Sequence, residues 1–217
     1  VERSRGLGDV YKRQAQLGAA YLEGNGVARN ADKAESLLTQ ASNAGQTFAT
    51  RLLGEAYLVG KLLPYQPTKG ERLLKQAAEA GDTNAMTVLG EAYLNGTTGE
   101  IRPSQGVALL EKAARQGDAY AMVVLGRAYS EGSGVPRDLA RAECWLTKAR
   151  DAGHPSAKEA LARTYRARGE RGNMQALIRA AQLGNPGAMA DLGRAYLNGA
   201  GIAKDLQLAR RWLRRAS

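Results

Sequence analysis

The sequence predicts an all-α protein, a right-handed α-solenoid of about six helix-turn-helix repeats. Three observations lead to this prediction. The motif Leu-Gly-x-Ala-Tyr recurs along the chain, with most of its tyrosines 36 residues apart. The alanine that ends a Leu-x-x-Ala element follows the same spacing, and so does the glycine four residues after it. Because a fixed period of about 20 to 50 residues is typical of stacked repeats, three agreeing registers predict one repeat array.

These landmarks define six repeats of two helices each. The repeated tyrosines are Tyr21, Tyr57, Tyr93, Tyr129, Tyr165 and Tyr196. The repeated alanines are Ala41, Ala77, Ala113, Ala149, Ala180 and Ala216. The alanine step into repeat five is 31 rather than 36 residues, so that repeat has lost five residues. The predicted repeats span residues 15–45, 46–81, 82–117, 118–153, 154–184 and 185–217.

Each repeat is predicted to contain a first helix (A) and a second helix (B). In repeat two, helix A is expected over residues 46–59 and helix B over residues 68–79, since apolar residues recur there three and four positions apart. Helix A also contains an internal glycine, which costs about 1 kcal/mol relative to alanine. That cost indicates close packing of A against B. These glycines are Gly54, Gly90, Gly126 and Gly193.

The loops between A and B differ among repeats. Repeats one, four and six have a Gly-x-Gly loop, whereas repeats two and three carry prolines just before helix B, where proline suits the first turn. The five missing residues of repeat five lie between Tyr165 and Ala180. We therefore expect a trimmed A–B loop there and a local change of curvature.

The repeated aromatic residues are interpreted as packing residues. Trp145 and Trp212 occupy the position of Leu73 in helix B, which predicts core packing rather than ligand stacking. The repeated tyrosines are assigned the same role, and each hydroxyl is expected to find a hydrogen-bond partner.

Both ends of the chain depart from the repeat. Residues 1–14 break the register, since Arg13 stands where repeat two has Ala49. They are interpreted as a non-native leader or a degenerate capping helix. Ser217 ends the last predicted B helix, and solenoids need their ends covered. The region 15–217 is therefore expected to be a single solenoid taken from a longer protein.

Composition excludes several classes of site. The chain has a net charge of +10, one cysteine and one histidine, which rules out a disulfide framework and a Cys- or His-rich metal site. Cys144 is expected to be partly exposed and inert, and His154 to be a turn residue. No apolar run approaches the roughly 20 residues of a membrane-spanning helix. We predict no catalytic residue, no cofactor and no metal.

The repeated residues resemble the Sel1-like repeat family, an α-solenoid relative of tetratricopeptide repeats, over residues 15–217. Over residues 52–138 the chain is also similar to the alginate export scaffold lipoprotein family, in Leu-Leu-Gly-x-x-Tyr-x-x-Gly-Lys (52–61), in Leu-Leu-Lys-x-Ala-Ala (73–78) and in Ser-Glu-Gly-Ser-Gly-Val (130–135). That resemblance implies a periplasmic, outer-membrane-associated solenoid. Its partners would be a secretion porin and polymer-modifying enzymes.

The candidate partner-binding residues lie on the A helices, which line the concave face of helical-pair solenoids. The position after Leu-Gly is acidic early in the chain and basic later, and neighbouring surface positions add an aromatic residue and a further arginine. We interpret the series as a groove whose charge orients a bound segment; the alternative is an ordinary solvated face. The candidates are Glu55, Glu91, Tyr120, Arg127, Arg163, Arg166 and Arg194.

The leading functional hypothesis is a non-catalytic protein-protein interaction scaffold, placed by resemblance in an exopolysaccharide secretion complex in the periplasm. A generic Sel1 adaptor in the cytoplasm is the first alternative. A second is binding of an anionic polysaccharide or nucleic acid by the basic C-terminal repeats. We disfavour nucleic acid because the arginines spread over both helices and a loop, rather than presenting one reading face on successive repeats.

Overall fold

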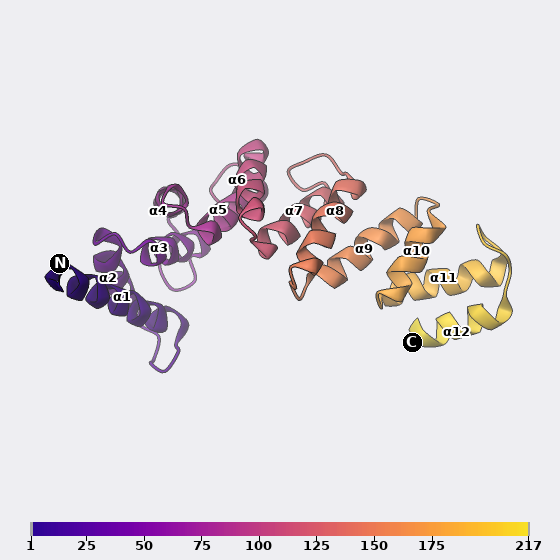
Figure 1. Cartoon of the computed structure of the whole chain (residues 1–217), viewed down its shortest axis with the longest axis horizontal. Coiled ribbons are helices and arrows are strands. Elements are labelled where there is room, and N and C mark those ends of the chain that lie inside the picture. The colour runs from indigo at the N-terminus through magenta and orange to yellow at the C-terminus, as the bar shows by residue number, and fades with distance from the viewer. Residues whose placement is uncertain (1, 217) are drawn as a thin grey trace. The chain divides into compact units, whose positions relative to one another are not determined.

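The computed structural model describes the backbone of residues 2–216 and the side chains from residue 8 to residue 216. Within that range the secondary structure consists of twelve α-helices, with no strand (Figure 1). In chain order the helices are α1 (Glu2–Glu23), α2 (Ala31–Asn43), α3 (Thr47–Val59), α4 (Pro67–Glu79), α5 (Thr83–Asn95), α6 (Pro103–Arg115), α7 (Ala119–Glu131), α8 (Leu139–Asp151), α9 (Ala157–Gly169), α10 (Met174–Gln182), α11 (Pro186–Asn198) and α12 (Leu206–Ala216).

The helices form six consecutive A–B pairs, from α1 with α2 to α11 with α12. This confirms the predicted all-α repeat fold. The pairs fall into two compact bodies, an N-terminal body that ends at Asp118 and a C-terminal body that begins at Ala119. Three pairs build each body. In repeat two the predicted boundaries hold to within one residue at the start of each helix.

Close packing of A on B is confirmed at the internal glycines. A Cβ atom added to Gly126 would lie 2.4 Å from Cγ of Leu146 on the paired helix. At Gly90 the same atom would lie 2.8 Å from Cγ of Leu110 and 2.9 Å from the carbonyl oxygen of Gly106. All three distances are shorter than the van der Waals contact of two non-bonded atoms. Only glycine therefore allows this separation of the two helices.

The core consists of small residues between large aliphatic ones, as in Ala49, Leu74 and Leu110, which are fully buried. The two tryptophans lie at its margin, where each keeps one face accessible. Trp212 packs on the core of the C-terminal body, as predicted. Trp145 is half-buried, with the Lys148 ammonium 4.6 Å from its ring centroid.

Repeat five is shortened in both its loop and its B helix. Four residues (170–173) join α9 to α10, against seven (132–138) between α7 and α8. Helix α10 has 9 residues, whereas α8 has 13. The predicted trimming is confirmed, and it extends to the first turn of helix B.

Helix α1 continues through the register break, since it is 22 residues long and begins at Glu2. Arg13 is exposed on it, whereas the corresponding Ala49 is fully buried. Among the described side chains of this helix, from residue 8 onwards, Ala15 is the first that is fully buried. The interpretation of residues 1–14 as a leader stays a prediction.

Candidate binding surfaces

The predicted acidic positions of the N-terminal body are half-buried rather than open. Glu55 accepts a hydrogen bond of 2.5 Å from Nη1 of Arg51, whose Nε lies 3.4 Å from Asp82. Burial raises the pKa of Glu55, against the opposing effect of Arg51. Glu91, on α5, is likewise half-buried. Because Arg51 offsets the charge of Glu55, this face is less acidic than its sequence implies.

The predicted basic positions of the C-terminal body are well exposed. The side chains of Arg127, Arg163 and Arg194 on α7, α9 and α11 are 51%, 56% and 62% accessible. Each lies within 4.0 Å of a carboxylate on its own helix. Exposed pairs of this kind contribute about 0 to 1 kcal/mol, so the guanidinium groups stay free to exchange partners.

The structure brings some of these predicted residues together and separates others. Arg127 and Arg163 line one hollow of about 330 Å³. Arg166 and Arg194 instead share the carboxylate of Asp191, at 2.8 Å from Nε of Arg166. Tyr120 stacks on His154 with the ring centroids 5.9 Å apart. His154 therefore lies in the inter-repeat turn, as predicted, and has a ring contact that the sequence did not reveal.

A recurring polar clamp between successive repeats was missed in the sequence. Three of the repeated tyrosines donate a hydrogen bond to a glutamate on the preceding B helix, always 22 residues earlier. The pairs are Tyr57 with Glu35, Tyr93 with Glu71 and Tyr165 with Glu143. The sequence contained a signal for this clamp, because Glu35, Glu71 and Glu143 follow the 36-residue period. Val107 occupies the corresponding position of the repeat between Glu71 and Glu143.

In the clamp at Glu71, two cations join the tyrosine. Oε1 of Glu71 accepts from Tyr93 Oη at 2.8 Å, and it lies 2.6 Å from Nη1 of Arg102 and 2.7 Å from Nζ of Lys75. Burial raises the pKa of Glu71, but the three hydrogen bonds outweigh it and lower the pKa to about 2. The carboxylate therefore stays ionised well into the acid range.

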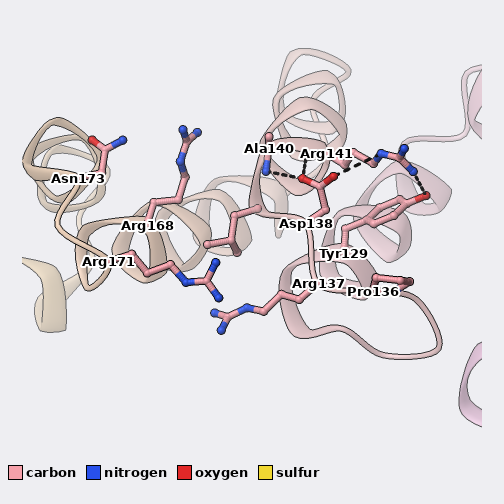
Figure 2. A pocket seen from close by; sticks show the side chains of 10 residues that line it. Tyr129, Pro136, Arg137, Asp138, Ala140, Arg141, Arg168, Arg171 and Asn173 are labelled. Carbon is pink, nitrogen blue, oxygen red and sulfur yellow. Dashed lines mark hydrogen bonds and ion pairs between the residues drawn. The ribbon is translucent and has the colours of Figure 1, made fainter.

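A larger and more basic groove lies on the C-terminal body, at the loops between A and B helices (Figure 2). It measures about 610 Å³ and is lined by the α7–α8 loop, the first turn of α8 and the α9–α10 connection. Arg137 and Arg141 come from repeat four, and Arg168 and Arg171 come from repeat five. The short α9–α10 connection of repeat five forms one side of the groove.

Asp138, the acidic residue that lines this groove, stabilises the start of α8. Oδ1 of Asp138 accepts hydrogen bonds from the backbone amides of Ala140 and Arg141, at 2.9 and 3.0 Å, and so caps α8. The amide of Arg141 is the main cause of a lowered pKa at Asp138. Asp138 also lies 3.4 Å from Nε of Arg141. Its one negative charge faces four guanidinium groups.

Arg137 and Arg171 differ from the other two arginines in their surroundings. Nε of Arg137 donates to the carbonyl oxygen of Ser130 at 2.8 Å, a neutral acceptor. Arg171 is exposed, and Figure 2 shows it among the side chains that line the groove with Arg137. Arg168, in contrast, is held by Glu143, which also binds Tyr165. The repeat pattern of the sequence does not reveal that Arg168 and Arg171 line one groove.

Metal sites and membrane-spanning helices find no support among the described residues. No cluster of three or more potential metal ligands lies within the described part of the chain. None of the described helices combines the length and apolar character needed to cross a membrane. Cys144 is exposed, as predicted.

Comparison with known families supports the repeat assignment. The Sel1 repeat model matches residues 14–46, 47–82, 83–118, 119–154 and 186–217. The chain belongs to the Sel1 repeat family. Its proteins are generally protein-interaction scaffolds. The matches begin within a residue of the predicted repeats, and they omit the shortened repeat five.

Solved structures give the same result. A protective antigen of uropathogenic Escherichia coli strains with an SLR fold is 28% identical, with a TM-score of 0.72 over 99% of this chain and 47% of that one. A Sel1 repeat protein from Oxalobacter formigenes is 30% identical, with a TM-score of 0.64 over 95% of this chain and 61% of that one. An immunity protein from Pseudomonas aeruginosa, 18% identical with a TM-score of 0.51 over 95% of this chain and 80% of that one, shares the fold.

The chain thus spans about half to three fifths of the first two proteins. No curated protein matches it. The narrower resemblance to the alginate export scaffold family gains no support from these comparisons, which point to Sel1 repeats in general.

Proposed function

We propose that the protein is a non-catalytic scaffold that binds partner proteins through exposed positions of its A helices. The observation that carries this proposal is the regular exposure of arginine on α7, α9 and α11 at the same position of each repeat. Arg127, Arg163 and Arg194 are all more than half accessible. The residues immediately before and after each of these arginines are buried, so the repeat leaves this position for contacts outside the chain.

Charge gives the face its selectivity. In the C-terminal body the hollow between Arg127 and Arg163 offers two guanidinium groups whose only carboxylate partners lie 4.0 Å away. A carboxylate of a partner can approach more closely and pair with both nitrogen atoms of a guanidinium. Complementary charge raises the association rate and fixes orientation more than it raises affinity. We therefore expect an acidic partner surface here.

Quantitative partner capture tests the proposal. Tagged wild-type protein is compared with the triple variant R127E/R163E/R194E, and bound proteins are quantified by mass spectrometry. The control is K204E/R210E/R211E, which makes the same change of charge at three exposed positions of repeat six. Both variants must retain the circular dichroism spectrum of the wild type.

The proposal predicts at least one partner that the wild type and the control retain and the A-helix variant loses. If the two variants capture the same proteins as the wild type in the same amounts, the A-helix face is not the interface. Equal losses with both variants would show that net charge, and not position, governs binding.

An exopolysaccharide secretion role is a narrower version of this proposal, and it rests on the sequence resemblance alone. Its partners would be the secretion porin and the polymer-modifying enzymes. Binding of an anionic polymer by the C-terminal repeats is the other candidate, and it would use the arginines of the basic groove in Figure 2.

A further inference from the structure

We infer that the groove between the α7–α8 loop and the α9–α10 connection is a second binding site, which takes an acidic peptide segment of a partner protein. It lies at the loop edge of the C-terminal body rather than on the exposed A-helix positions. It rests on the proposed function only in taking a protein as its ligand.

The arrangement of charge is the first argument. Four arginines and one carboxylate, Asp138, line the groove; Asp138 caps α8 and pairs with Arg141, and Arg168 pairs with Glu143. Arg137 donates from its Nε to a neutral carbonyl oxygen, and Arg171 is exposed. Two guanidinium groups that line one groove repel each other, and a bound carboxylate relieves that repulsion.

The extent of the basic surface is the second argument. Arg137 lines both this groove and the smaller hollow that contains Arg127 and Arg163. The two hollows therefore adjoin at Arg137, and the basic surface continues beyond the groove. A single small anion would occupy only part of the groove. A segment with several acidic residues can fill the groove and continue past Arg137.

The lining favours a peptide over a nucleic acid. Pro136 and Ala140 are exposed among the arginines and offer an apolar contact to a side chain. Proteins that bind single-stranded nucleic acid stack bases on exposed aromatic side chains. The aromatic residue of this groove, Tyr129, is only 5% exposed, with the Arg141 guanidinium 5.4 Å from its ring centroid. Its ring face is therefore unavailable for stacking, whereas carboxylate and apolar side chains both find a contact.

The origin of the groove ties it to this chain. Repeat five has a four-residue connection and a nine-residue B helix, and its absence from the family matches shows that it departs from the common repeat. Arg171 and Asn173, which line the groove, lie in that shortened connection. The site is therefore built partly by the repeat that departs from the common pattern.

Fluorescence anisotropy with the full chain tests the inference. The probe is a short fluorescein-labelled peptide rich in Glu and Leu, and its control has Gln in place of every Glu. The protein variants are R171E, R137E/R171E and, as a charge-matched control for the double variant, R210E/R211E on α12. Competitors are a single-stranded oligonucleotide and an alginate oligomer, each of the same net charge as the peptide.

We expect the acidic peptide to bind and the Gln peptide not to bind. In R137E/R171E two attractions are lost and two repulsions are gained, each of the size typical of an exposed ion pair, so the Kd should rise about tenfold. R171E should give a smaller rise, and R210E/R211E should change the Kd by less than about twofold.

Three outcomes would overturn the inference. These are no binding of the acidic peptide, equal weakening by the groove variant and its control, and tighter binding of the oligonucleotide or the alginate oligomer than of the peptide. The test is separate from partner capture by the A-helix face, since R171E leaves Arg127, Arg163 and Arg194 in place. Failure of one site therefore does not imply failure of the other.

Discussion

Replacement of Gly126 by leucine should destabilise the C-terminal body, because this glycine sets the distance between α7 and α8. Its added Cβ would lie 2.4 Å from Cγ and 2.7 Å from Cδ2 of Leu146, and 3.3 Å from the carbonyl oxygen of Ala142. Leu146 is fully buried, so moving it away from the new side chain costs contacts elsewhere in the core. The helices must separate, or Leu146 must adopt a strained rotamer.

The size of the effect follows from two opposing contributions. Overpacking of a tight site costs about 1 to 3 kcal/mol, and a clash that begins at the first carbon of the new side chain belongs at the upper end. Leucine is a better helix former than glycine by about 1 kcal/mol. The expected net loss is about 2 kcal/mol, which for a chain of this length lowers Tm by about 4 to 8 °C.

The matched control is Ser133→Leu, which adds the same side chain at an exposed loop position two residues after the end of α7. Surface substitutions of this kind usually change stability by less than about 0.5 kcal/mol. Thermal and urea unfolding followed by circular dichroism measure both variants. Equal unfolding midpoints for G126L and S133L would refute the packing argument.

Two further predictions concern stability. The pKa of Glu71 lies at about 2, below its ordinary value, so the stability that its ionised form contributes is present above about pH 5 and is lost as the pH falls towards 2. Allowing for solvent screening of the half-exposed Lys75, we expect E71Q to lower the free energy of unfolding by about 2 kcal/mol at pH 7 and by much less at pH 3. Urea unfolding at the two pH values measures this loss, and a loss independent of pH would contradict the prediction. Deletion of residues 1–14 should lower the free energy of unfolding by less than about 1 kcal/mol, because Val10 and Arg13 are exposed and Ala15 is the first fully buried side chain among those described. A loss of stability above about 2 kcal/mol in thermal unfolding would show that these residues act as a cap.

The repeat period was enough to predict the helices, because each landmark has one physical role. Gly126 packs against a neighbouring helix, Ala49 fills a small gap in the core, and Gly60 ends α3 with a left-handed backbone at φ 63°. Such roles repeat whenever the unit repeats. The period therefore carries both the positions of the helices and the nature of their contacts.

The binding surfaces were harder to predict, because they depend on departures from the period. The basic groove combines Arg137 and Arg141 of repeat four with Arg168 and Arg171, which come from the end of α9 and the shortened connection of repeat five. Arg166 illustrates a second difficulty, since it was predicted to face a partner and instead binds Asp191 at 2.8 Å. A surface charge can be located from a repeat pattern, but its partner depends on the side chains that the fold brings near it.

The association rate of a captured partner tests the central claim, that the exposed A-helix arginines form a protein-binding face, most directly. Rates are measured by biolayer interferometry from about 50 to 200 mM salt for the wild type, R127E/R163E/R194E and K204E/R210E/R211E. The account predicts that the A-helix variant associates at least about tenfold more slowly at low salt, with a shallower dependence on salt, while the control follows the wild type. Superimposable rates for all three proteins across the salt series would contradict it.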